Sequence, residues 1–87
     1  MVTVQEAFAK AQAFAREALG DRQYTLEEVE RDFYKGREVW RLTLGFPKPR
    51  VTAPDLIRAL GAALLLEYKT VLVDSSTGEP IAIKLAS

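Results

Sequence analysis

The sequence predicts an α+β domain of two layers, with an N-terminal helix packed on a four-stranded antiparallel sheet. Three observations predict this class: residues 3–19 have helical periodicity, and two pairs of strand-like segments flank turns at Lys35-Gly36 and at residues 75–78. A short second helix is expected at residues 52–64, inserted between the two hairpins. Because no repeat, linker or low-complexity tract divides the chain, residues 1–87 are expected to form a single domain.

The N-terminal segment has the clearest helical pattern in the sequence. Thr3 and Glu6 have the spacing of a capping box, and Gly20 stands where a helix commonly ends. The apolar residues of 4–19 recur at helical spacing, and alanine is the commonest among them. Since small side chains let a helix approach its neighbour closely, we expect this helix to lie flat across the sheet.

Residues 24–46 have the pattern of a β-hairpin. Residues 40–46 alternate between apolar and other side chains, as a half-buried strand does, and Lys35-Gly36 supplies a two-residue turn. A helix is the alternative for the first half, because Thr25-Leu26-Glu27-Glu28 is itself a capping box and the apolar residues that follow fit helical spacing. We favour the strand, because the turn and the charge pairing described next both require it.

Folding the chain about that turn gives a register in which side chains of opposite charge face each other. Glu30 then lies opposite Arg41, and Val29 lies opposite Leu42, as cross-strand pairing favours. In the same register Arg31 falls on the apolar face of the strand. The apolar pattern also requires a bulge near Glu27.

The last third of the sequence predicts a second hairpin, with strands at residues 67–74 and 80–85. Before it, Thr52 and Pro54 mark the start of the expected second helix. In the hairpin, Asp74 is expected to pair with Glu79. That pairing aligns one face of the first strand with the second strand, namely Tyr68, Thr70 and Leu72 with Leu85, Ile83 and Ile81. The other face of the first strand then carries Lys69, Val71 and Val73.

The composition excludes several kinds of chemistry. Cysteine and histidine are both absent, which removes disulfides, thiolate nucleophiles, the usual zinc ligands and the commonest general base. Twelve Lys and Arg balance twelve Asp and Glu, so no excess of positive charge predicts binding to nucleic acid or to an anionic membrane. No cofactor and no metal are expected.

The sequence also predicts a location. The first residues have no basic segment followed by an apolar one, so no signal peptide is visible. The longest apolar run, residues 60–66, is far shorter than the roughly 20 residues that span a bilayer. Together with the lack of cysteine, these features predict a cytoplasmic protein.

Two segments resemble a known family. Residues 67–81 contain a strand ending in Val73-Asp74, a short turn with Thr77-Gly78-Glu79 and an apolar return strand, and they resemble the closing hairpin of PepSY domains. Residues 40–46 resemble the central strand that precedes it. The resemblance implies a cystatin-like helix-on-sheet layout and a non-catalytic domain attached to or directed at peptidases, usually outside the cytoplasm. The inserted helix, and the lack of a visible leader or second domain, depart from that pattern.

Two groups of polar side chains have alternative interpretations. Glu28, Glu30 and Asp32 share one strand face, where they would suit calcium or magnesium, but a solvated face paired with arginines is the stronger interpretation. Trp40 beside Arg41 has the composition of a contact to single-stranded nucleic acid. The alternation of Trp40 with apolar residues favours a core position instead.

The sheet face that the N-terminal helix leaves uncovered is the candidate binding surface. A partly apolar face mixed with charges favours an interaction site, although an ordinary solvated face is the alternative. The candidate partner-binding residues are Tyr34, Val39, Arg41, Val71 and Val73.

The sequence therefore predicts a non-catalytic protein-binding or inhibitory module that acts through this face or through an edge strand. We expect it to bind a protein partner or a second copy of itself, and to bind neither nucleic acid nor membrane. A domain that restrains a peptidase and an immunity protein that neutralises a toxin are alternatives within the same class. A carboxylate-based, metal-dependent enzyme is the remote alternative.

Overall fold

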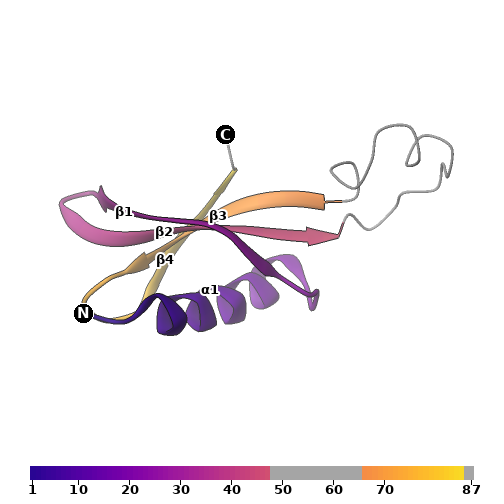
Figure 1. Cartoon of the computed structure of the whole chain (residues 1–87), viewed down its shortest axis with the longest axis horizontal. Helices are drawn as coiled ribbons and strands as arrows, with labels where there is room; N and C mark the ends of the chain where they lie inside the picture. Colours follow the sequence, from indigo (N-terminus) through magenta and orange to yellow (C-terminus); the bar gives the residue numbers. More distant parts are fainter. Residues whose placement is uncertain (48–65, 86–87) are drawn as a thin grey trace, which may run out of the picture.

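The computed structural model describes residues 1–47 and 66–85. They form a helix and four strands, in the order α1 (Val4–Leu19), β1 (Thr25–Tyr34), β2 (Arg37–Pro47), β3 (Leu66–Asp74) and β4 (Pro80–Leu85). The strands make one antiparallel sheet in the order β1-β2-β3-β4, and α1 lies across one of its faces (Figure 1). The predicted α+β class and the helix-on-sheet arrangement are thus confirmed, whereas the predicted second helix at 52–64 lies outside the described residues.

Both ends of α1 are stabilised as the sequence predicts. The Glu6 N–H donates to Thr3 Oγ1 at 3.1 Å, and the Thr3 N–H donates to Glu6 Oε1 at 3.0 Å, which completes the capping box. At the other end Gly20 has a φ of 108° and donates its N–H to the Arg16 carbonyl at 3.1 Å. A residue with a side chain would be strained at that φ, so the glycine fixes where the helix stops.

Alanine forms the contact surface of α1. Ala7, Ala11 and Ala15 are 0–1% exposed and pack against the sheet. Because they are small, the helix backbone lies close to the strands beneath it. The rest of this core comes from the residue before β1 and from β2 and β3, namely Tyr24, Leu42, Leu44, Phe46, Val71 and Val73.

The β1–β2 hairpin has the predicted register. Glu30 lies opposite Arg41 and Val29 opposite Leu42, with a register shift between Leu26 and Glu28 where a bulge was expected. Thr25–Tyr34 is therefore a strand, and the alternative helix is wrong. Lys35 and Gly36 have φ values of 50° and 79°, the pattern of the type I′ turn that suits the twist of a two-residue hairpin.

The β3–β4 hairpin departs from its predicted register after the first pair. Val73 lies opposite Pro80 as predicted, but Leu72 lies opposite Ala82 and Val71 opposite Ile83. The register shift between Leu72 and Val73 moves every later residue of β4 by one position. Since neighbouring residues of a strand point to opposite faces, this shift changes which face of β4 meets α1.

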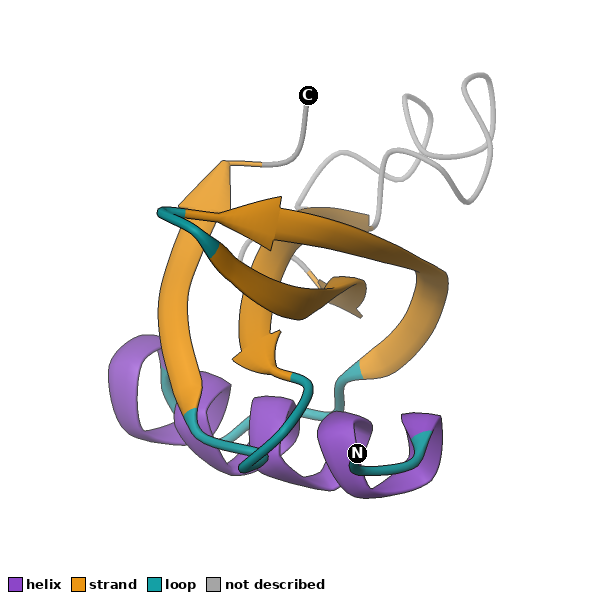
Figure 2. Cartoon of the chain, turned by 90° about the vertical axis from the view of Figure 1, so that its left-hand side faces the viewer, coloured by secondary structure: helices purple, strands orange, loops and turns teal. Residues whose placement is uncertain are grey.

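The sheet is strongly twisted and coiled, which makes the face opposite α1 concave (Figure 2). Among the described residues no helix lies on this face, which is called the helix-free face below. The row of paired residues that starts at Lys84 runs through Thr70 and Thr43 to Glu28. In a flat sheet Tyr34 would lie roughly 20 Å further along β1 than Glu28. The Lys84 Nζ nevertheless lies 4.5 Å from the centre of the Tyr34 ring, so coiling brings these two corners of the sheet together.

Candidate functional site

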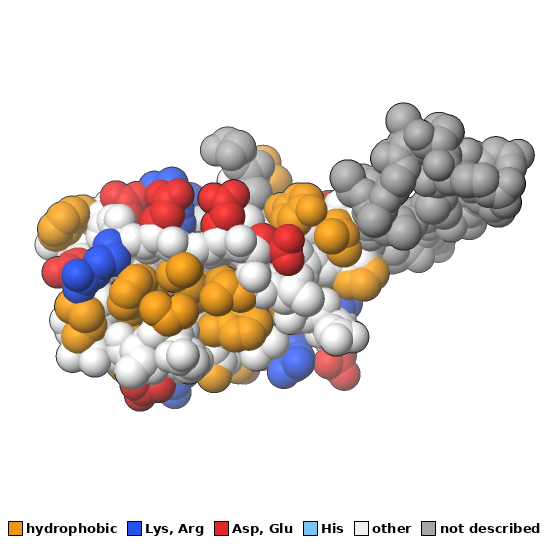
Figure 3. Space-filling model, viewed as in Figure 1, with side chains coloured by type: hydrophobic (Ala, Val, Ile, Leu, Met, Phe, Trp, Pro, Cys, Tyr) orange, Lys and Arg blue, Asp and Glu red, His pale blue; other side chains and the backbone are white. Residues whose placement is uncertain are grey.

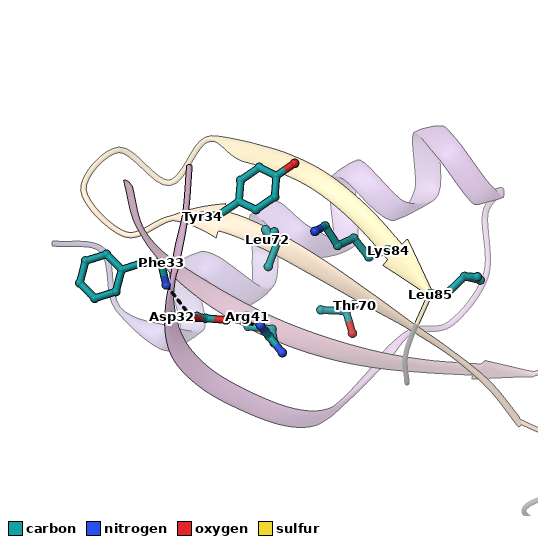
Figure 4. Close-up of a pocket in the computed structure, with 8 residues that line it drawn as sticks. All are labelled: Asp32, Phe33, Tyr34, Arg41, Thr70, Leu72, Lys84 and Leu85. Carbon is teal, nitrogen blue, oxygen red and sulfur yellow. Dashed lines mark hydrogen bonds and ion pairs between the residues drawn. The ribbon is translucent and has the colours of Figure 1, made fainter. Parts of the chain in front are cut away.

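A hollow of about 130 Å³ opens on the helix-free face, and all four strands contribute to it (Figure 4). Its lining includes Asp32 and Tyr34 of β1, Arg41 of β2, Thr70 and Leu72 of β3, and Lys84 of β4. Pockets that enclose a small organic ligand or cofactor usually measure roughly 300–1,000 Å³. The hollow is therefore large enough for one side chain or a small ionic group.

Asp32 and Arg41 form an ion pair within the hollow. Asp32 Oδ1 also accepts a hydrogen bond from the Phe33 N–H at 2.7 Å. This backbone hydrogen bond, and then the positive charges of Arg41 and Lys84, hold the pKa of Asp32 below its usual value. Asp32 is thus ionised at neutral pH, where it offers no proton to a substrate and neutralises Arg41.

Tyr34 lies between two lysines. The Lys84 Nζ is 4.5 Å and the Lys35 Nζ 5.3 Å from the centre of its ring, both within cation–π range. Figure 4 shows Leu72 next to both Tyr34 and Lys84. Leu72 is only 3% exposed although α1 covers the opposite face, and the coiled sheet with these long side chains accounts for that burial.

The structure divides the predicted binding residues between two faces of the sheet. Tyr34 and Arg41 line the hollow, and Val39 lies on the same face but is 1% exposed. Val71 and Val73 are fully buried in the core with α1. Their expected position on the uncovered face is therefore wrong. The reason is the pairing of β3 with β2, which places Val71 opposite Leu42 and Val73 opposite Trp40 on the helix-covered face. The register shift between β3 and β4 then places Ile83 beside Val71 on that face.

Lys84 and Thr70 also line the hollow, although the sequence pattern did not predict them as site residues. They belong to the second hairpin, and their approach to Tyr34 depends on the coiling of the whole sheet, which no local pattern reports. The sequence of β3 gives no clear signal, because polar side chains occur on both of its faces: Glu67 and Lys69 share one face with Val71, and Thr70 and Asp74 share the other with Leu72.

The three acidic residues of β1 share one strand face, as the sequence predicts. Glu28, Glu30 and Asp32 lie on the helix-free face, because they pair with Thr43, Arg41 and Val39. Within residues 1–47 and 66–85, no three acidic side chains are close enough to hold a metal ion. Trp40 packs against the core, and its indole N–H donates to the Val2 carbonyl at 3.2 Å.

The edge of β1 is a second candidate surface, because β1 is the first strand of the described sheet and only β2 pairs with it. Leu26, Val29 and Phe33 point to the same side as α1, yet α1 packs mainly on the other three strands. Val29 is 39% and Phe33 73% exposed. In Figure 3 apolar side chains gather between this edge and the helix, below a row of acidic ones.

The turn determines which backbone groups of β1 point away from β2. A type I′ turn joins Tyr34 and Arg37 by a hydrogen bond, and hydrogen-bonded and non-hydrogen-bonded pairs then alternate along an antiparallel ladder. By this alternation the N–H and C=O groups of Val29, Arg31 and Phe33 point outward. The Phe33 N–H is bound by Asp32, which leaves Val29 and Arg31 as the residues whose outward N–H groups can pair with another strand.

No protein-family model, curated protein or solved structure matches this chain. The resemblance to PepSY domains therefore stays a prediction from the sequence. Within the described residues, no helix is both long and apolar enough to cross a membrane.

Proposed function

We propose that this chain is a non-catalytic protein-binding module that takes an extended segment of another protein along the edge of β1, by strand addition. The observation that carries the proposal is the presence, on one ten-residue strand, of outward backbone groups and exposed apolar side chains. An added strand would pair with Val29 and Arg31 and would cover Val29 and Phe33 with its own side chains.

The helix-free face has less to offer a partner than this edge has. Its arginines are already ion-paired within the chain, Arg41 with Asp32 and Arg37 with Asp74. Two of its apolar residues, Val39 and Leu72, are buried. A partner on that face would have to compete with existing ion pairs, whereas a partner at the edge of β1 would meet unpaired backbone groups.

Restraint of a peptidase and neutralisation of a toxin are both forms of such binding, and the identity of the bound partner distinguishes them. We also propose a cytoplasmic location, because a protein without cysteine forms no disulfides and needs no oxidising environment.

The test uses a proline at an outward-facing amide. Val29→Pro removes the outward N–H that a partner strand would need, and it leaves the hydrogen bonds between β1 and β2 in place. Wild-type protein, Val29→Pro and Val29→Thr are each tagged and exposed to lysate of the producing cells, and the bound proteins are quantified by mass spectrometry. We expect a protein that wild type and Val29→Thr retain and that Val29→Pro loses.

Circular dichroism must show that Val29→Pro is folded, since an unfolded variant would lose every partner. A folded Val29→Pro that retains the same proteins in the same amounts as wild type would contradict strand addition at this edge. The matched change Val29→Thr keeps both the N–H and the branched side chain, so it controls for the loss of valine alone.

A further inference from the structure

The two sides of β1 differ sharply in chemistry. The helix-free side carries Glu28, Glu30 and Asp32 in alternating positions. Asp32 is ion-paired with Arg41. Glu28 and Glu30 are exposed, and neither takes part in an ion pair with any residue of 1–47 or 66–85. Two uncompensated carboxylates thus lie side by side along this edge, about 7 Å apart.

The other side of β1 presents apolar groups to an incoming strand. Val29 and Phe33 are exposed, and Arg31 lies between them. The charge of Arg31 is compensated within the chain, because its guanidinium is 2.9 Å from Glu38 Oε1 and lies 5.3 Å from the centre of the Trp40 ring. A partner strand therefore meets carboxylates on one side of its backbone and apolar side chains on the other.

The backbone geometry brings a partner side chain close to Glu30. The outward groups belong to Val29 and Arg31, so these residues form hydrogen-bonded pairs with an antiparallel partner. The residue opposite Glu30 then occupies a non-hydrogen-bonded pair, in which the Cα atoms are about 4.5 Å apart and the side chains are closest. Directly opposed charges of like sign destabilise such a pair, and charges of opposite sign stabilise it.

A second copy of this chain is a poor partner for the same edge. When two copies pair antiparallel about a twofold axis, with both helices on the same side, each register opposes residues that share a face. Centring the pair on Val29 places Glu28 opposite Glu30, and centring it on Glu30 places that residue opposite its copy. Centring it on Arg31 places Glu30 opposite Asp32. Each of these registers opposes carboxylates, which disfavours self-pairing.

We propose that β1 binds an antiparallel segment in which Lys or Arg alternates with apolar residues. The basic residues lie opposite Glu28 and Glu30, and the apolar residues lie opposite Val29 and Phe33. This inference rests on the proposed function, since it specifies the chemistry of the segment that strand addition would bring to β1.

The test compares three labelled synthetic octapeptides by fluorescence anisotropy at neutral pH. The first alternates lysine with valine, and the second alternates glutamate with valine. The third has the composition of the first, arranged as lysine pairs and valine pairs. We expect the first peptide to bind at least about tenfold more tightly than each of the others, and its affinity to fall as salt is added.

Charge reversal on β1 should reverse this preference. The double variant Glu28→Lys/Glu30→Lys is expected to bind the glutamate–valine peptide more tightly than the lysine–valine peptide. The matched control is Glu17→Lys/Glu79→Lys, which makes the same change in net charge at two exposed positions away from β1. The control should keep the wild-type preference. Val29→Pro should bind none of the alternating peptides.

The outcomes separate this inference from the proposed function. If the two alternating peptides bind equally and Val29→Pro abolishes both, strand addition stands and the basic preference is wrong. If the paired-lysine peptide binds as tightly as the alternating one, the attraction is of charge alone and the inference is overturned. If no peptide binds, the inference is also overturned, and the lysate comparison with Val29→Pro decides the proposed function by itself.

Discussion

The two hairpins of the sheet are held at their turns by different means. The β1–β2 turn is defined by its backbone, because Lys35 and Gly36 both adopt positive φ. The β3–β4 turn, in which Gly78 also has a positive φ, is held in addition by a side chain: Asp74 Oδ1 accepts hydrogen bonds from the Ser76 and Thr77 N–H groups at 2.8 and 3.0 Å.

The second turn is also tied to distant parts of the chain. Asp74 forms an ion pair of 2.9 Å with Arg37 at the start of β2. The Ser75 hydroxyl donates to the Glu38 carbonyl at 3.0 Å, and the Ser75 carbonyl accepts from the Val2 N–H at 2.8 Å. The first hairpin therefore depends on its own ladder, whereas the second also depends on polar contacts that join three regions.

The largest effect is expected from breaking the ladder of the first hairpin. Glu30→Pro should lower the free energy of unfolding by about 3 kcal/mol, because the Glu30 N–H points toward β2 and its loss removes a ladder hydrogen bond. Val29→Pro, one residue away, should cost much less, since that N–H points outward. Urea unfolding of both variants measures the two costs, and equal costs would contradict the assigned direction of the amides.

Acid should weaken the second turn. Hydrogen bonds from Thr77 and Ser76, and then the charge of Arg37, hold the pKa of Asp74 below its usual value. Its contribution to stability is therefore complete above the unfolded pKa of about 3.9 and is lost as the pH falls through the lower folded pKa. Melting temperatures measured from neutral to strongly acidic pH should fall steeply for wild type in that range.

Asp74→Asn is the matched variant for this prediction, because it keeps the acceptor oxygen and has no charge to titrate. It should melt at a lower temperature than wild type at neutral pH and show a flatter acid profile. Asp32→Asn should flatten the profile less, since the Asp32 side chain is 35% exposed and that of Asp74 only 7%. An unchanged acid profile in Asp74→Asn would show that other groups cause the loss.

A smaller effect is expected at the link between the hairpins. Ser75→Ala removes a buried hydroxyl that donates to the Glu38 carbonyl, and it should cost about 1 kcal/mol of unfolding free energy. Ser76→Ala is the control, because that side chain is exposed and should be nearly neutral. Equal costs, measured by urea unfolding, would mean that the link contributes little.

The smallest effect is a gain at the first turn. Lys35 has a φ of 50°, a conformation that costs free energy for most residues and that asparagine adopts more readily. Lys35→Asn should raise the free energy of unfolding by about 0.5–1 kcal/mol. Lys35→Ala should bring no such gain, and a gain of the same size with alanine would point to loss of the lysine charge instead.

The hairpins also differ in how well the sequence predicts them. In β1–β2 the charges of Glu30 and Arg41 and the apolar pair Val29 and Leu42 agree on one register, and the structure has it. In β3 apolar residues occur on both faces. A one-residue shift in the β3–β4 register at Leu72 therefore replaces one plausible set of core residues with another. A register is predictable where the two faces of a strand differ, and ambiguous where they are alike.

The two candidate surfaces also differ in how well the sequence predicts them. The hollow beside Tyr34 and Lys84 depends on the coiling of four strands, which the sequence pattern does not encode locally. The sequence does indicate the exposed edge of β1, because Arg31 is a charged residue on an otherwise apolar face. The structure explains it, since α1 packs mainly on the other strands and leaves that part of the face at the margin.

The contact of Val2 with Ser75 determines when folding can finish during synthesis. The strands on which α1 packs include β3 and β4, which are translated after it. Part of its alanine surface must therefore stay uncovered until β3 and β4 have been translated. Contacts between such distant residues slow folding, because a long loop must close before they form. A ribosome stalled before residue 66 should hold a nascent chain with no native core.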